Sequence, residues 1–200
     1  MKWFLAKASG RCAVRKDPFN LIVTHYPGYD NYIVVREKLR KVIEDAKIID
    51  TSQSVILLLA VDPYEAVEKI KNTQEFSSSP ILRVIPVDAV TDVFVDRIKE
   101  AVHDIFKMKA HAGESFRIKI DGRVYKRGQG EVVRLHRSEA IEFIAQGLDN
   151  PVNLEKPDWL IYIKTLRLYR ATELASITVS RPEQILSFAP KEQVVEDEEL

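Results

Sequence analysis

The sequence predicts an α/β chain of the α+β type that is built from two successive units. Two observations predict this class: strand-like and helix-like segments alternate along the chain, and the pattern starts anew near residue 90. The length of 200 residues suits one ordinary domain or two small ones. A composition of 46% hydrophobic and 30% charged residues is typical of a globular protein and argues against a collagen-like or wholly disordered chain.

The first strand and the first helix are predicted on either side of a turn. Residues 21–23 are a β-rich run, and the Pro-Gly pair at 27–28 favours a turn after it. From Asn31 onward the apolar residues recur every three or four positions, which predicts an amphipathic helix. Asp30 or Asn31 is expected to cap the start of that helix.

Two more strands and a second helix are predicted in the first unit. Residues 54–61 predict a buried strand, because this apolar run is too short for a core helix. Asp62, Pro63 and Glu65 suit the cap and the first turn of the helix that follows. Residues 81–87 predict a third strand, and the proline near its end indicates a sheet edge or a strand end.

These elements predict the domain organisation. The order strand–helix–strand–helix–strand, with helices on one face of the sheet, predicts a ferredoxin-like domain over residues 1–90. A second domain is expected over residues 91–182. Residues 183–200 are expected to form an acidic tail, because residues 191–200 hold one Lys and five acids.

The second unit is predicted to contain two helices and three strands. They are a helix over 94–105, a strand over 116–121, a glycine-containing loop over 122–130, a helix capped by Ser138, and strands over 160–168 and 174–179. In the first of these strands, Phe116, Ile118 and Ile120 alternate with Arg117 and Lys119. Since successive side chains of a strand point to opposite faces, its outward face is expected to carry two cations.

The charge of the chain is balanced overall but unevenly distributed. Lys and Arg number 30, and Asp and Glu also number 30. Residues 107–137, however, contain nine Lys and Arg against three acids, a net charge of +6. Such asymmetry is typical of a surface that binds a polyanion, although a charge run can equally be a solvated face.

The cationic segment contains the candidate binding residues. Phosphates require several cations converging on one surface, and the planar fork of Arg can grip two oxygens. A strand, a loop and a helix start could build such a surface for RNA, with the helix N-terminus adding partial positive charge. The candidate RNA-binding residues are Arg117, Lys119, Arg123, Lys126, Arg127, Arg134, His136 and Arg137.

Enzyme motifs and metal sites are not evident in the sequence. The Gly128-x-Gly130 pair lacks the third glycine and the preceding strand of a dinucleotide fingerprint, so no cofactor is expected. The four histidines lack metal-site spacing, and no metal is expected. The single cysteine, Cys12, cannot form an internal disulfide, which favours a reducing, cytoplasmic location. The longest apolar run, residues 55–61, is too short to cross a membrane.

Residues 93–179 resemble the THUMP domain, an RNA-binding module of tRNA-modifying proteins. The matching segments are Ser115–Ile120, Arg127, Leu135–Ile141, Val152-Asn153-Leu154 with Pro157-Asp158, and Leu160–Ile163. The Asn-Leu…Pro-Asp pattern before an apolar strand is the most specific of them. Residues 81–88 are similar to the junction of the THUMP adaptor proteins required for tRNA cytidine acetylation, which also place a ferredoxin-like domain before THUMP.

This resemblance implies a function in tRNA modification. It implies a tRNA-binding adaptor that is not itself an enzyme and that presents tRNA to a separate modifying enzyme, an acetyltransferase. A methyltransferase would need a further nucleotide-binding domain of about 150–200 residues, and a thiouridine synthetase would need a pyrophosphatase loop. Two alternatives remain open at this point: a small RNA-modifying enzyme with an unrecognised active site, and a protein-interaction module.

Overall fold

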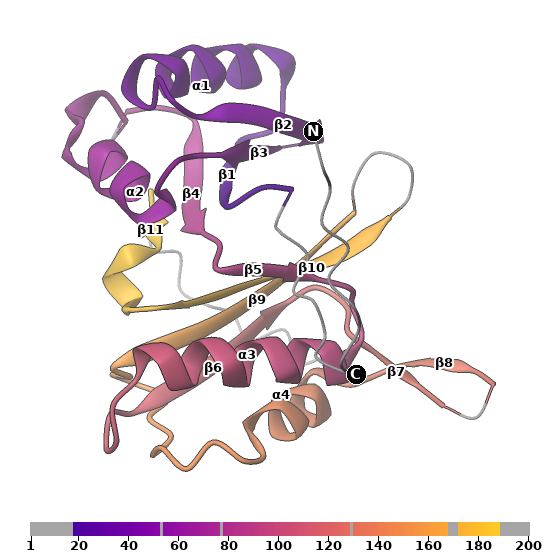
Figure 1. Cartoon of the computed structure of the whole chain (residues 1–200). Helices are drawn as coiled ribbons and strands as arrows, with labels where there is room; N and C mark the ends of the chain where they lie inside the picture. Colours follow the sequence, from indigo (N-terminus) through magenta and orange to yellow (C-terminus); the bar gives the residue numbers. More distant parts are fainter. Residues whose placement is uncertain (1–17, 53, 77, 129, 168–171, 189–200) are drawn as a thin grey trace, which may run out of the picture.

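Two β-sheets lie face to face, and two helices cover the outer face of each (Figure 1). The computed structural model describes residues 18–188 apart from 53, 77, 129 and 168–171. Cys12 and the acidic residues 191–200 lie outside the described residues. Within the described residues, no helix combines the length and the apolar character needed to cross a membrane.

The first sheet confirms the ferredoxin-like prediction. Its strand order is β11-β4-β1-β3-β2, and all neighbouring strands are antiparallel. Its elements are β1 (Leu21–His25), α1 (Tyr29–Val42), β2 (Lys47–Ser52), β3 (Val55–Leu59), α2 (Pro63–Asn72), the 3-10 turn η1 (Gln74–Phe76), β4 (Ile81–Pro86) and β11 (Leu186–Ser187). The chain order β1-α1-β2-β3-α2-β4 is the ferredoxin-like order.

The two predicted helix starts of this unit have different outcomes. The Asp62 carboxylate accepts hydrogen bonds from the backbone N–H of Tyr64 (2.8 Å) and Glu65 (3.1 Å), which confirms the predicted cap of α2. The predicted cap of α1 is wrong. That helix follows Gly28, and the Asn31 amide turns back to donate to the Pro27 carbonyl (2.8 Å).

Strand β2 was not predicted. It is the edge strand of the first sheet, and no residue of Lys47–Ser52 is fully buried. An edge strand with so little burial lacks the apolar run or strict alternation by which a strand is detected in sequence. The short strands β5, β7, β8 and β11 were also missed, because two or three residues are too few to show a repeating pattern.

The second sheet has the strand order β5-β10-β9-β6, in which β6 and β9 are parallel. Its elements are β5 (Ala89–Thr91), α3 (Val95–Lys109), β6 (Phe116–Asp121), the hairpin strands β7 (Tyr125–Arg127) and β8 (Val132–Arg134), α4 (Arg137–Ala145), β9 (Trp159–Arg167), β10 (Glu173–Ser180) and the 3-10 turn η2 (Pro182–Gln184). The predicted helices and strands of this unit are thus present. Helices α3 and α4 pack on the face that carries Phe116 and Ile118.

The inner faces of the two sheets share a hydrophobic core. Ile22, Leu57 and Ile85 of the first sheet form one buried cluster with Tyr162 and Leu166 of the second. The C-terminal segment returns to the first sheet, where β11 pairs with β4. The boundaries expected after residues 90 and 182 stay a prediction, because the shared core and the returning strand tie the two units together.

A half-buried polar network also joins the two units. Lys109 Nζ lies 2.6 Å from Asp88 Oδ1 and 2.7 Å from both the Tyr64 hydroxyl and the Val179 carbonyl. The Tyr64 hydroxyl and the backbone N–H of Val179 donate to the Asp88 carboxylate as well. Because α2, the β4–β5 link, α3 and β10 all contribute, this network ties the first helix layer to the second sheet.

Candidate nucleic-acid interface

Strand β6 places two of the predicted cations at the edge of the second sheet. Arg117 stands opposite Leu160 and Lys119 opposite Tyr162 in the parallel register with β9. Leu160 and Tyr162 belong to the core between the sheets, so the two cations lie on the face turned toward the first sheet. They are nevertheless exposed, because β6 is the last strand of its sheet.

The turn after β6 positions Arg123. Its backbone N–H donates to Thr165 Oγ1 (3.0 Å), while its side chain is exposed. The preceding Gly122 has φ 113°, and a Cβ at this position would collide with the Thr165 hydroxyl. Glycine is therefore required here for the chain to leave the strand beside β9.

The β7–β8 hairpin divides its cations between two faces. Tyr125 pairs with Arg134, and Arg127 pairs with Val132, so Arg127 and Arg134 share one face. Lys126 pairs with Val133 on the other face, and its Nζ lies 5.8 Å from the centre of the Phe143 ring of α4. The hairpin brings two of its three predicted cations together and turns the third away.

The start of α4 supplies the last two candidates. His136 is the residue before the helix, and its backbone N–H donates to the Glu139 carboxylate (3.1 Å). The prediction that Ser138 caps the helix is wrong: Ser138 lies within the first turn, and its hydroxyl is 2.7 Å from His136 Nδ1. Arg137 is exposed beside this helix start.

All eight predicted residues are exposed, and one of their seven Lys and Arg side chains meets an acid. Among the described residues, Arg127 is the one Lys or Arg of the set whose side chain has a carboxylate within 4 Å, Asp92 at 3.8 Å. The Arg127 guanidinium also lies 4.1 Å from the centre of the Phe94 ring. Arg117 donates to the Leu154 carbonyl (2.8 Å), which leaves its charge uncompensated. The positive charge of this set therefore remains available to an anion.

The structure adds Arg83 and Lys164 to the cations near β6, and the sequence reading missed both. Arg83 is half-buried on β4, and Lys164 donates to Asp121 Oδ2 (2.5 Å). The pKa of Lys119 is lowered, first by burial and then by the charges of Arg83 and Arg117. The sequence does hold one signal for Arg83: it lies two residues before Ile85 on a predicted strand, and therefore on the same face. The residues of β6 and β9 that it approaches belong to the other unit, so this signal could not reveal them.

The Asn-Leu…Pro-Asp motif shapes a loop. Asn153 Oδ1 accepts the backbone N–H groups of Glu155 (3.1 Å) and Lys156 (3.0 Å). The Asp158 carboxylate accepts the backbone N–H (2.7 Å) and the hydroxyl (2.6 Å) of Ser115. These contacts shape the loop before β9 and attach it to the start of β6, which accounts for Asn153 and Asp158 of the motif in structural terms.

Glu114 forms hydrogen bonds at the end of the second sheet where β6 and β9 begin. Its carboxylate accepts hydrogen bonds from the Trp159 indole N–H (2.8 Å) and from Arg181 (2.6 Å), whose guanidinium lies 4.2 Å from the centre of the Trp159 ring. The pKa of Glu114 is lowered to about 2, first by the backbone N–H of His111 and then by these two side chains. The folded protein thus holds this group ionised more strongly than an unfolded chain does.

This shift predicts an acid-sensitive contribution to stability. Since the folded pKa lies below the ordinary value of 4.5, the contribution is complete above about pH 4.5 and is lost as the pH falls toward 2. Glu114→Gln should lower the free energy of unfolding at pH 7 and flatten its decline between pH 4.5 and 2. Urea unfolding at pH 7, 4 and 3 measures both effects. Glu155→Gln, in the neighbouring loop, is the control, and equal pH profiles for the two variants would contradict the assignment.

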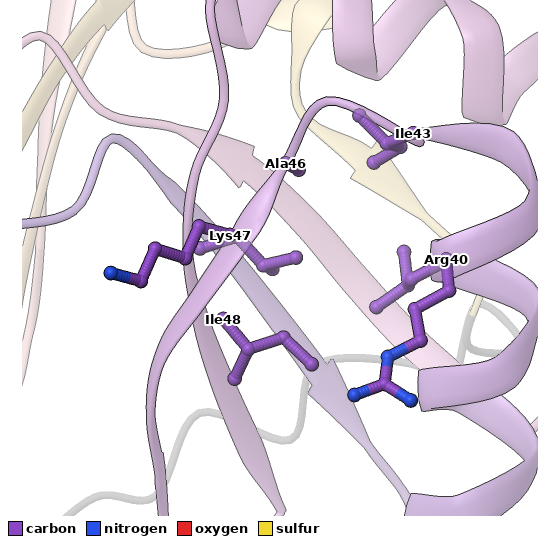
Figure 2. A pocket seen from close by; sticks show the side chains of 7 residues that line it. Arg40, Ile43, Ala46, Lys47 and Ile48 are labelled. Atoms are coloured by element: carbon purple, nitrogen blue, oxygen red, sulfur yellow. The ribbon is translucent and has the colours of Figure 1, made fainter.

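One pocket lies away from the cationic residues, between α1 and β2. It has a volume of about 300 Å³, and Leu39, Ile43, Ile48 and Leu58 form much of its lining. Figure 2 shows Ile48 and the Arg40 side chain on opposite sides of the opening. Five of its seven lining residues are aliphatic, the other two are Arg40 and Lys47, and no acid or histidine lines it. Across the described part of the chain, no three His, Cys, Asp or Glu residues are grouped as metal ligands.

No protein-family model and no curated protein matches the chain. Among solved structures it is similar to PH1313 from Pyrococcus horikoshii Ot3, with 15% identity, a TM-score of 0.53, and coverage of 80% of this chain and 54% of that one. TrmN from Thermus thermophilus has 14% identity, a TM-score of 0.49 and coverage of 80% and 46%. A 4-thiouridine synthetase–RNA complex with bound ATP has 14% identity, a TM-score of 0.44 and coverage of 82% and 42%. The chain spans about half the length of these proteins.

These comparisons correct one expectation and show the fold. The expectation that the chain is not an enzyme is wrong on these findings. The similar structures include TrmN and a protein whose name is that of an enzyme, a 4-thiouridine synthetase. The lack of a recognisable motif therefore does not exclude catalysis. At 15% identity the similarity to PH1313 shows the fold alone, and the chain has the THUMP-like α+β fold that its sequence predicts.

Proposed function

We propose that this chain binds tRNA in the cytoplasm and presents it to a tRNA-modifying active site. The RNA-binding surface consists of the exposed cations of β6, the β7–β8 hairpin and the start of α4. The similarity of residues 81–88 and 93–179 to the THUMP adaptor proteins favours a tRNA cytidine acetyltransferase on a separate chain as the partner. Binding the tRNA in a fixed orientation places the target nucleotide at the active site that modifies it, which any enzyme acting on tRNA requires.

A single observation carries the binding proposal: the cations are exposed and largely unpaired. Of the seven Lys and Arg residues among the eight predicted residues, Arg127 alone has a side chain within 4 Å of a carboxylate in the described part of the chain, and that contact is a long one at 3.8 Å. Exposed cations elsewhere in the described part of the chain include paired ones, such as Lys69 with Glu65 (2.9 Å), and unpaired ones, such as Lys41 and Lys107. The candidate set differs in that most of its Lys and Arg residues are unpaired and follow one another within one short segment of the sequence. A surface that repels itself in this way gains free energy when phosphates neutralise it.

Binding to an unmodified tRNA transcript is expected to weaken steeply as salt is added. Each phosphate contact contributes about −0.7 to −0.9 to the slope of log affinity against log salt concentration, because counterions are released. Five contacts would therefore produce a slope of about −3.5 to −4.5. Fluorescence anisotropy between 50 and 300 mM KCl measures this slope. Absence of tRNA binding at 50 mM KCl, together with capture of an acidic protein, would contradict the proposal and favour a protein-interaction module.

A further inference from the structure

Arg83 projects from the first sheet into the space beside β6. On β4 it lies two residues before Ile85, which is fully buried in the core between the sheets. Residues two apart on a strand share a face, so the Arg83 side chain leaves β4 toward the second sheet. It is half-buried there, and it forms a side-chain hydrogen bond with the Tyr162 hydroxyl of β9, which opposes the rise in the pKa of that hydroxyl caused by burial.

The second sheet presents its own cations to the same space. Lys119 pairs with Tyr162 in register, and its Nζ lies 6.0 Å from the centre of the Tyr162 ring. Arg117 lies two residues earlier on the same face of β6. The Tyr162 hydroxyl donates to Asp121 Oδ2 (2.9 Å), the oxygen that also accepts from Lys164. Tyr162 thus lies between the two sheets, where Arg83 of the first sheet and Lys119 of the second both approach it.

Positive charges exceed negative charges around Tyr162. Four cations gather there, Arg83, Arg117, Lys119 and Lys164, and Asp121 is the acid that faces them. Asp121 is already engaged by Lys164, with which it forms a salt bridge. In the described part of the chain, Arg83, Arg117 and Lys119 have no carboxylate within 4 Å. Three cations that converge without an acid of their own form a site for an anion.

The position of this cluster also connects it with the rest of the cationic surface. Arg137, at the start of α4, lies close enough to Lys119 for its charge to lower the pKa of that lysine. The positive surface therefore continues from the helix start, across the edge strand β6, to β4 of the first sheet. Cations contributed by several elements to one surface suit a chain of phosphates better than a single small anion.

We propose that Arg83, Arg117 and Lys119 form a second phosphate-binding site, which bridges the two sheets and holds the ribose-phosphate backbone of the bound RNA. The RNA strand that contacts the hairpin and the start of α4 continues across β6 and reaches the first unit at Arg83. This inference rests on the proposed tRNA binding and extends it, since it assigns an RNA contact to a residue outside the THUMP-like segment.

The convergence of the cations can be tested without RNA. Arg83→Gln removes one of the three charges, those of Arg83, Arg117 and Arg137, that lower the pKa of Lys119, so the pKa of Lys119 should rise toward its ordinary value. Lysine side-chain NMR titration measures this change. Lys41→Gln is the matched control, because Lys41 lies on α1, on the outer side of the first sheet. An unchanged Lys119 pKa in Arg83→Gln would show that the two groups do not share a site and would overturn the proposal.

The RNA contact is then tested by the salt dependence of tRNA binding. Arg83→Gln should weaken affinity about fivefold near 0.1 M salt and make the salt slope shallower by about 0.7, the value of one phosphate contact. Lys41→Gln should change neither quantity, and Arg83→Lys should retain most of the slope. Inorganic phosphate is the second probe: competition at micromolar levels would indicate a small-anion site and overturn the assignment to RNA.

The outcomes separate this inference from the proposed function. If Arg83→Gln keeps both the affinity and the slope of the unmodified chain while charge reversal at the hairpin abolishes binding, the bridging site is refuted and tRNA binding stands. If the unmodified chain does not bind tRNA, the proposed function fails, and the bridging site fails with it. Thermal unfolding of Arg83→Gln checks that any loss of affinity occurs in a folded protein.

Discussion

The fourfold charge reversal Arg123→Glu, Arg127→Glu, Arg134→Glu and Arg137→Glu is expected to reduce affinity for tRNA by about 10²–10³ at 0.1 M salt. Four lost phosphate contacts each contribute about −0.7 to the salt slope, which at this ionic strength corresponds to nearly three decades of affinity. The four introduced acids add repulsion to that loss. Fluorescence anisotropy with a tRNA transcript measures the change.

The fold should survive this variant, because all four side chains are exposed and Arg127 alone has a charged partner among the described residues. The matched control reverses four cations on α1 and α2, Arg40, Lys41, Lys69 and Lys71, which lie on the outer side of the first sheet. Both variants change the net charge equally. Equal losses of affinity would show that total charge, and not the named surface, determines binding.

Asp88→Ala is expected to lower the free energy of unfolding by about 2–4 kcal/mol. The substitution removes the acceptor of Lys109, of the Tyr64 hydroxyl and of the Val179 N–H, and it leaves the Lys109 ammonium with 28% exposure and no counter-charge. The pKa of Tyr64 is raised by its burial and then by Asp88, so its hydroxyl remains a donor throughout the range of measurement. Urea unfolding at pH 7 measures the loss.

A second substitution distinguishes a lost pair from a disturbed fold. Asp88→Ala combined with Lys109→Met removes both charges, so part of the lost stability should return. The exposed pair of Glu65 and Lys69 is the control: Glu65→Gln should cost less than about 0.5 kcal/mol. A loss below 1 kcal/mol for Asp88→Ala would show that the network does not hold the two units together.

Much of the architecture could be predicted because its signals are local. The alternation of Phe116, Ile118 and Ile120 with cations, and the cap formed by Asp62, depend on residues within one strand or one turn. The failures arose where the local signal is weak or misleading. Strand β2 lacks buried residues, and Gly28 begins α1 where an acid or amide was expected. In each case the neighbouring strand or the turn geometry decided the element, and neither is visible in a window of a few residues.

The candidate site was predicted in composition and only partly in arrangement. The sequence identified eight candidate residues, seven of them Lys or Arg, and the structure shows each of the eight exposed. It could not predict that Lys126 faces away from Arg127 and Arg134, because the register of β7 with β8 decides this. Nor could it join Arg83 to Lys119, since the two residues lie 36 positions apart and belong to different sheets.

By itself, then, the sequence determined the α+β class, the periodicity of the main helices and strands, and the concentration of cations between residues 107 and 137. The tertiary structure alone decided how the sheets lie against each other, which cations share a face, and how the half-buried Asp88–Lys109 network ties the units together. The physical reason is that hydrophobic periodicity acts between near neighbours, whereas charge and burial depend on distance in space between residues that the fold brings together.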